Sequence, residues 1–210
     1  MKFDFTTIYD RRGKDAMAVD AVEKIPVFQP NEGFDAIPMW GADMNFATAP
    51  AVTETIRKRL EHPLFGYFMP SDEYFDSIIR WQQRRNGVTG LEKEHIGYEN
   101  GVLGGLMSAL AAVCARGDNV LVHSPTYIGF TRSIENGGYH VITSPLKPDR
   151  YGVQRMDFFD METKIKRNDI RAVVFCSPHN PTGRVWEQEE LEHFMDMAQR
   201  LNVTVISDEI

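Results

Sequence analysis

The sequence predicts an α/β fold in which a mostly parallel sheet carries helices on both faces. The first observation is a pair of runs rich in β-branched and apolar residues, at residues 172–176 and 203–207, each with polar side chains at its carboxyl end. Such runs are typical of strands buried on both faces of a sheet. The second observation is a segment rich in Glu, Leu and Met between them, residues 187–201, which predicts a helix and therefore a β-α-β unit. The third is a similar unit upstream, with strand 119–123, helix 128–136 and strand 139–143.

The composition fits a folded α/β protein and argues against several classes of partner. The chain has 210 residues, of which 42% are hydrophobic and 25% charged, enough for one domain with a core. A net charge of -7 with no basic stripe argues against nucleic acid as a partner. No apolar run is long enough to cross a membrane and no signal peptide is recognised, so a cytoplasmic location is expected.

The cysteines and histidines do not predict a metal site. Cys114 and Cys176 are far apart in apolar surroundings, and we expect both to behave as buried small hydrophobes. The six histidines are scattered, with no spacing typical of metal ligands.

The N-terminal third is predicted to be an extended arm followed by two helices. Residues 1–36 have few apolar positions, with weak helical character at 16–24. A helix is expected over 51–62, with Thr48 as its N-cap and an apolar stripe that predicts packing against another element. The next helix is expected from Ser71 to Arg85.

A glycine-containing turn at residues 99–106 predicts an anion site. It follows a short predicted strand at 95–98 and opens an apolar helix that runs to Ala115. Free backbone N–H groups and the helix dipole favour an anion at such a turn. We expect the donors to be the N–H groups of Gly101, Val102 and Leu103. The pattern is neither the Rossmann G-x-G-x-x-G nor a P-loop, and close helix packing would also explain the glycines.

Three polar or aromatic side chains follow predicted parallel strands. Tyr127 follows strand 119–123, Asn180 follows strand 172–176, and Asp208 follows strand 203–207. The carboxyl ends of parallel strands meet at one edge of a sheet, where ligands bind in open α/β folds. We therefore expect Tyr127, Asn180 and Asp208 to converge on one cleft.

The motifs at these strand ends resemble those of fold-type-I pyridoxal 5'-phosphate (PLP) enzymes. Ser-Pro-His-Asn-Pro-Thr-Gly at 177–183 and Ser-Asp-Glu at 207–209 carry the resemblance. It implies that Asn180 binds the phenolic oxygen of PLP, Asp208 the pyridine nitrogen, and that Tyr127 stacks on the ring. It also implies that the turn at Gly101 holds the phosphate of PLP.

Motifs nearer the N-terminus resemble those of one branch of these enzymes. Pro-Met-Trp-Gly-Ala-Asp-Met-Asn-Phe at 38–46 and Phe-Gly-Tyr at 65–67 are similar to the cystathionine β-lyase (C–S lyase) branch, of the MalY and PatB type. The resemblance implies a substrate-carboxylate site along the backbone of Trp40, Gly41 and Ala42. It also implies a homodimer in which Tyr67 reaches the PLP phosphate of the neighbouring subunit. Asn45 departs from the usual Asp, which leaves a role for this side chain open.

The function implied by the resemblance is β-elimination from a sulfur amino acid. The products would be a thiol, pyruvate and ammonia, and PLP would supply the electron sink. In the family, the Lys that binds PLP and an Arg that binds the substrate carboxylate lie beyond the position of Ile210. We therefore assign no catalytic residue and expect the 210 residues alone to be inactive. An aminotransferase, a non-catalytic regulatory module of this fold and a truncated product remain alternatives.

The same resemblance predicts that the chain is the N-terminal half of such an enzyme. Residues 1–49 would be an N-terminal arm with a segment of the small domain, and residues 50–210 an incomplete PLP-binding large domain. The family's sheet order is 3-2-4-5-6-7-1, with strands 1 to 5 expected at 95–98, 119–123, 139–143, 171–176 and 203–207. Strands 6 and 7 would be missing beside strand 5. We expect residues 1–210 expressed alone to be insoluble or molten, without the absorbance of an internal aldimine when PLP is added.

Overall fold

A four-stranded parallel sheet organises residues 70–210 in the computed structural model, which describes residues 3–210. Its strands are β1 (Asn119–Ser124), β2 (His140–Pro145), β5 (Ala172–Cys176) and β6 (Thr204–Asp208), in the spatial order β2-β1-β5-β6. This is the relative order 3-2-4-5 predicted for these segments, so that part of the sheet prediction is confirmed. A separate two-stranded hairpin consists of β3 (Lys147–Pro148) and β4 (Gln154–Arg155).

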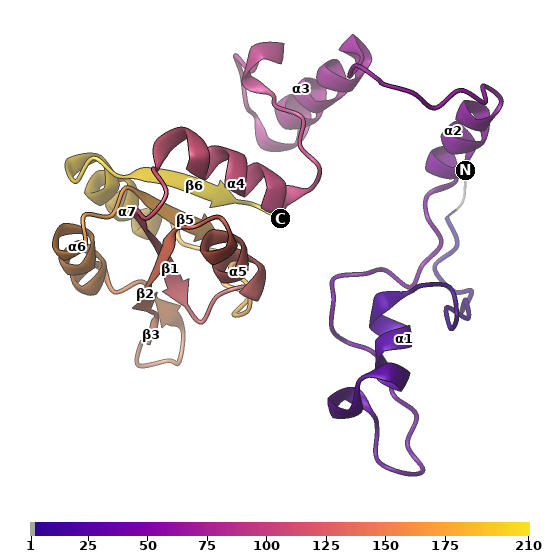
Figure 1. Cartoon of the computed structure of the whole chain (residues 1–210), viewed down its shortest axis with the longest axis horizontal. Coiled ribbons are helices and arrows are strands. Elements are labelled where there is room, and N and C mark those ends of the chain that lie inside the picture. Colours follow the sequence, from indigo (N-terminus) through magenta and orange to yellow (C-terminus); the bar gives the residue numbers. More distant parts are fainter. Residues whose placement is uncertain (1–2) are drawn as a thin grey trace. The chain divides into compact units, whose positions relative to one another are not determined.

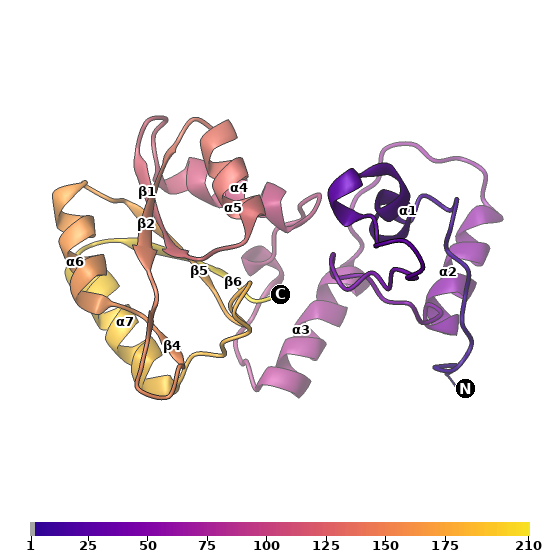
Figure 2. The ribbon, with the colours of Figure 1, turned by 90° about the horizontal axis from the view of Figure 1, so that it is seen from below.

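Helices cover both faces of the sheet, as predicted (Figure 1). Figure 2 shows α4 and α5 on one side and α6 and α7 on the other. The four helices are α4 (Val102–Val113), α5 (Ile128–Asn136), α6 (Phe158–Arg167) and α7 (Gln188–Arg200). Between β5 and β6, α7 forms the predicted β-α-β crossover.

Successive side chains of β5 point to opposite faces of the sheet and pack in two separate hydrophobic cores. Val173 and Phe175 of β5 pack in the core that contains Met161, Phe194 and Met197 of α6 and α7. The intervening residues of β5 pack in the second core, with Leu106, Leu110, Phe130 and Ile134 of α4 and α5. Because successive side chains of a strand point to opposite faces, a fully apolar strand is what a sheet between two helix layers needs. The run Ala172–Cys176 is buried at every position for this reason.

Residues up to Met69 form a second unit, distinct from Pro70–Ile210. It contains α1 (Met17–Lys24), the 3-10 turn η1 (Pro26–Phe28) and α2 (Pro50–Leu60). The C-terminal unit begins with α3 (Asp72–Asn86) and the 3-10 turn η2 (Lys93–His95). The predicted boundary between residues 49 and 50 concerns the domains of a complete enzyme and stays a prediction.

Three local predictions for the first hundred residues are wrong. Residues 95–98 form no strand: η2 ends at His95, and no strand among the described residues pairs with this segment. The N-cap of α2 is Ala49 rather than Thr48, because Pro50 occupies the first helical position. The apolar stripe of α2, consisting of Val52, Ile56 and Leu60, is exposed and not packed within the described chain.

The other caps and boundaries follow the sequence closely. The helix expected from Ser71 is α3, which Ser71 caps with its hydroxyl accepting from the Tyr74 N–H at 3.2 Å. The helix expected at 128–136 is α5 with the same bounds. In the described residues, no helix is both long and apolar enough to cross a membrane. The predicted cytoplasmic location stays a prediction.

Candidate functional site

The carboxyl ends of β1, β5 and β6 bring the three predicted strand-end residues to one edge of the sheet. Each neighbouring pair of these strands is parallel, and Cys176 at the end of β5 is in register with Asp208 at the end of β6. Tyr127 lies in the short connection after β1 and forms the N-cap of α5, and Asn180 lies in the turn after β5. The strand ends thus share one edge, while the expected convergence of the three side chains on one cleft and their contacts with a ligand stay predictions.

Asp208 lines a hollow of about 420 Å³ between β6 and the start of α4. Val102, Gly105 and Leu106 of α4 line the same hollow, together with Phe130 of α5. The Cys176 thiol lies against this carboxylate, with 3.9 Å between Sγ and Oδ2. Burial, with a further contribution from Asp208, raises the pKa of the Cys176 thiol. This cysteine is therefore a neutral, buried neighbour of Asp208 and no candidate nucleophile, as its apolar setting predicted; Cys114 is only half-buried.

The N-terminus of α4 reaches this hollow at Val102 and has backbone N–H groups without a helical partner. The first helical hydrogen bond runs from the Gly105 N–H to the Gly101 carbonyl, at 3.1 Å. The N–H groups of Val102 and Leu103 precede it and have no partner within the helix. Gly101 enters the helix with φ of +90°, a conformation that favours glycine. Its own N–H donates to the Glu99 carbonyl at 3.0 Å, so Val102 and Leu103 are the available donors of the predicted set.

Tyr127 does not line this hollow but presents a partly exposed ring that contacts one of its lining residues, Phe130. The ring packs edge to face on Phe130, with centroids 5.4 Å apart and an interplanar angle of 85°. A Cβ on Gly129 would lie 2.3 Å from the Tyr127 ring, so only glycine leaves room for this orientation. Gly129, the second residue of α5, therefore leaves the space that this direction of the tyrosine needs.

The turn that carries Asn180 also buries a histidine that sequence reasoning did not single out. His179 is 1% exposed, whereas the neighbouring Asn180 is exposed. The His179 Nδ1 lies 2.8 Å from the Thr182 hydroxyl, and its ring packs against His123 and Trp186. Burial lowers the pKa of His179. A histidine within an apolar strand or a buried turn is the only sequence signal that could have identified this pair.

The remaining predicted site residues belong to the N-terminal unit. Trp40 packs on Phe28 with ring centroids 4.8 Å apart. Trp40, Gly41 and Ala42 line a hollow of about 250 Å³ next to the ion pair between Arg11 and Asp43. Their proposed contact with a substrate carboxylate stays a prediction.

Tyr67 is fully exposed, which is compatible with the expected contact across a dimer interface but does not test it. A larger hollow of about 850 Å³ in the same unit lies among the loops of the arm and contains none of the predicted site residues. Among the described residues, no cluster of three or more His, Cys, Asp or Glu side chains is placed to hold a metal ion.

Comparison with curated proteins finds lyases among the relatives. Cystathionine beta-lyase PatB of Bacillus subtilis is 38% identical over 176 residues, which cover 84% of this chain and 45% of PatB. Protein MalY of Escherichia coli is 31% identical over 212 residues, covering 99% of this chain and 52% of MalY. The chain thus spans about half the length of the curated relatives it matches.

Comparison with solved structures also finds a lyase among the similar proteins. The PLP-bound C–S lyase from Staphylococcus hominis superimposes with a TM-score of 0.86 at 33% identity, covering the whole of this chain and 52% of the lyase. The predicted cofactor is therefore the one bound in this neighbour. A family model described as "Aminotransferase class I and II" matches residues 41–210. The chain accordingly belongs to the aminotransferase class I and II family, with cystathionine β-lyases and C–S lyases among its relatives.

Proposed function

We propose that this chain is the PLP-binding part of a carbon–sulfur β-lyase that acts on a sulfur amino acid. The observation that carries the proposal is the shared hollow at the sheet edge. A carboxylate from β6, Asp208, and the N-terminus of α4 open onto the same space. An acid at one end and anion-binding amides at the other suit a cofactor with a basic ring nitrogen and a phosphate.

The residues at this edge fit PLP in their donor and acceptor chemistry. The Val102 and Leu103 N–H groups would bind the phosphate, and Asp208 would hold the ring nitrogen protonated. Tyr127 would cover one face of the ring, and the exposed Asn180 amide would donate to the phenolic oxygen. When bound, PLP supplies an electron sink that stabilises negative charge at the substrate's α-carbon. The protein's own task is to keep the ring nitrogen charged and the ring fixed in orientation.

The rest of the proposal concerns the complete enzyme and depends on the likeness to the lyase branch. The backbone of Trp40, Gly41 and Ala42 would bind the substrate carboxylate, and Tyr67 would complete the phosphate site of a twofold-related subunit. No lysine in residues 1–210 lies in the motif that binds PLP covalently, so no residue of this chain is assigned the proton transfer. The substrate class rests on the lyases among the relatives.

An aminotransferase is the second candidate. The description of the matching family favours it, since the same Asn, Asp and Tyr would serve both reactions. The Trp-Gly-Ala-Asp-Met and Phe-Gly-Tyr segments favour the lyase, because they resemble that branch. The two reactions share every contact proposed at the sheet edge, so product analysis has to separate them.

The test uses the protein at the length that its gene encodes, with cystathionine as substrate. We expect PLP binding and release of pyruvate and ammonia. Substitution Asp208→Asn should weaken PLP binding about 10- to 100-fold, because a hydrogen bond to a charged group contributes about 1.5–3 kcal/mol. Amino-group transfer to a 2-oxo acid without pyruvate release would establish the aminotransferase instead. Absence of PLP binding would overturn both candidates.

A further inference from the structure

The turn that carries Asn180 is closed by backbone hydrogen bonds between its two ends. The chain leaves β5 at Cys176 and returns at Arg184. The His179 N–H donates to the Arg184 carbonyl at 2.7 Å, and the Gly183 N–H donates to the His179 carbonyl at 2.7 Å. These bonds point His179 into the core and leave Asn180 exposed. The direction of Asn180 therefore depends on where Arg184 is held.

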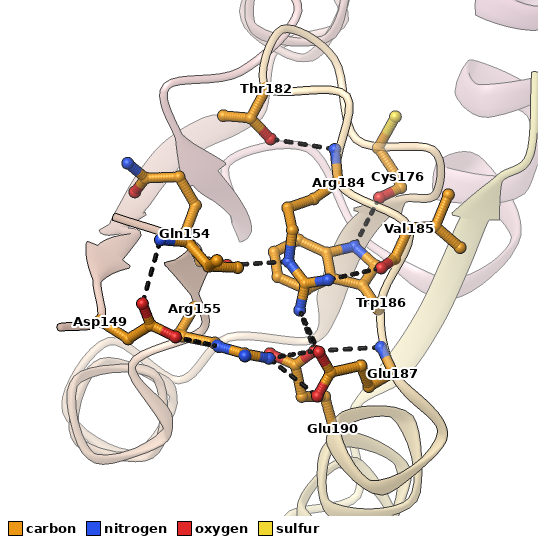
Figure 3. Close-up of polar contacts among 11 residues, drawn as sticks. Asp149, Gln154, Arg155, Cys176, Thr182, Arg184, Val185, Trp186, Glu187 and Glu190 are labelled. Carbon is orange, nitrogen blue, oxygen red and sulfur yellow. Dashed lines mark hydrogen bonds and ion pairs between the residues drawn. The ribbon is translucent and has the colours of Figure 1, made fainter. Parts of the chain in front are cut away.

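Arg184 is fixed by contacts on all sides of its guanidinium group (Figure 3). Its Nε donates to the Gln154 carbonyl at 3.0 Å, its Nη1 to the Val185 carbonyl at 2.6 Å, and its Nη2 pairs with the Glu190 carboxylate. The group also lies over the Trp186 ring, 5.1 Å from the centroid. The arginine side chain is only 14% exposed, so solvent does not replace these contacts. A lysine could not make them, because it lacks the planar fork of donors.

Glu190 connects this arginine to the first turn of α7 and to the β3–β4 hairpin. One oxygen, Oε2, accepts from Arg184, from the Glu187 N–H at 3.0 Å and from Arg155 Nη1 at 3.3 Å. Arg155 is further paired with Asp149 at 3.1 Å and with Glu187 at 2.9 Å. Glu187, Asp149 and Glu190 together raise the pKa of Arg155. Figure 3 shows the Glu190 carboxylate between the guanidinium groups of Arg184 and Arg155.

We infer that Arg184 and Glu190 are positioning residues for Asn180. They hold one end of the turn against α7 and the hairpin, and the Trp186 indole holds the other end by donating to the Cys176 carbonyl at 2.9 Å. We assign neither the Arg184 nor the Glu190 side chain a contact with the ligand. Both therefore affect ligand binding through the position of Asn180. The ligand-binding consequence rests on the proposed function, in which Asn180 binds the phenolic oxygen of PLP. The structural claim, that this pair fixes the turn, is independent of it.

A double-mutant cycle tests the ligand-binding consequence. PLP dissociation constants are measured by fluorescence quenching for the wild type, Arg184→Lys, Asn180→Ala and the double variant, at the length that the gene encodes. We expect Arg184→Lys to weaken PLP binding about tenfold, the loss of roughly one hydrogen bond. In the Asn180→Ala background the same change should have almost no further effect. The control Arg200→Lys, at a half-exposed pair with Asp196 on the far end of α7, should leave PLP binding unchanged.

Independent, multiplying losses from Arg184→Lys and Asn180→Ala would overturn the inference, since Arg184 would then act by another route. Glu190→Gln, which keeps the shape of the side chain, replaces Arg184→Lys if that variant fails to fold.

Amide hydrogen exchange tests the structural claim without any ligand. Arg184→Lys should raise the exchange rates of the His179 and Gly183 amides about tenfold, while the Val174 amide in β5 stays unchanged. Unchanged exchange at His179 and Gly183 would overturn the inference even if PLP binds. If the wild type binds no PLP but these amides respond, the proposed function fails and the positioning role of the pair stands.

Discussion

The imidazole of His123 lies in the core near the carboxyl end of β1 and makes no hydrogen bond to the described residues through either ring nitrogen. Burial, and secondarily the neighbouring His179, lower the pKa of His123 to about 4. In the unfolded chain a histidine has a pKa of about 6.5. Between these values the unfolded state binds a proton that the folded state does not, so stability falls as the pH falls. We expect a loss of about 3 kcal/mol in the free energy of unfolding between pH 7 and pH 4, measured by denaturant titration.

The variant His123→Phe isolates this contribution from that of the carboxylates. Phenylalanine cannot be protonated, so the decline below pH 6.5 should become shallower. The matched control is His140→Phe, at an exposed position of β2, which should keep the wild-type pH dependence. An equal decline in the wild type and in His123→Phe would show that His123 is not the group responsible.

Single residues at strand ends could be predicted, whereas the residues that hold them could not. The placement of Tyr127, Asn180 and Asp208 at one edge could be predicted because a parallel sheet fixes where its strands end, while their roles stay a prediction. The contact between Arg184 and the Gln154 carbonyl joins positions 30 residues apart, and no local pattern encodes it. The same is true of His123 beside His179, since the neighbours of a buried side chain are decided by packing between elements.

Several helices and strands matched their predicted bounds to within a residue, whether or not they have a partner on both sides. The bounds of β1, β5 and β6 hold to within a residue, although only β5 is a continuous apolar run and β6 lies at an edge. Residues 95–98 have strand-like composition, but composition alone forms no strand without a neighbouring strand to accept its hydrogen bonds. The exposed stripe of α2 is a similar case for helices. The spacing of its apolar residues predicts that they share one face of the helix, but it does not predict which element packs against that face.

Leu110 of helix α4 is completely buried in one of the two hydrophobic cores beside the sheet. Substitution Leu110→Ala removes side-chain contacts and leaves a cavity, so we expect a loss of about 2–5 kcal/mol in the free energy of unfolding. The control Phe159→Ala removes a larger side chain that is 83% exposed on α6, and should change stability by about 0.5 kcal/mol or less. Equilibrium denaturation of both variants checks the difference. Comparable losses would mean that α4 is not packed as described.

In the molecule as a whole, the stabilising cores lie in residues 70–210. Both hydrophobic cores consist of residues from this unit. In the described part of the N-terminal unit, the buried hydrophobic residues are only Ala16 and Ala18. Because burial of apolar area is the main stabilising term, nearly all of the folding free energy of the described chain arises around the sheet. Whether the edge strands of this sheet have a pairing partner therefore bears on whether the chain self-associates in solution.

The outer side of β6 is an open edge in the described chain. The Thr204 N–H donates to the Arg171 carbonyl, and the Asp208 carbonyl accepts from the Ser177 N–H, each at 3.0 Å. Both groups face β5. Since alternate residues of a parallel strand bond to the same neighbour, the N–H and C=O groups of Val205 and Ser207 point to the other side. No strand of the described residues pairs there, and β6 contains no Lys or Pro that would discourage pairing with another chain.

We therefore expect residues 1–210, expressed by themselves, to self-associate through β6. Ser207→Pro should reduce this association without lowering the melting temperature, because the N–H that it removes bonds to nothing in the sheet. The matched variant Thr204→Pro removes the donor to Arg171 and should lower the melting temperature markedly. Sedimentation velocity at increasing concentration measures association, and thermal melts measure stability. A monomeric wild-type chain, or two proline variants that are equally unstable, would show that the edge of β6 is not the surface through which the chain associates.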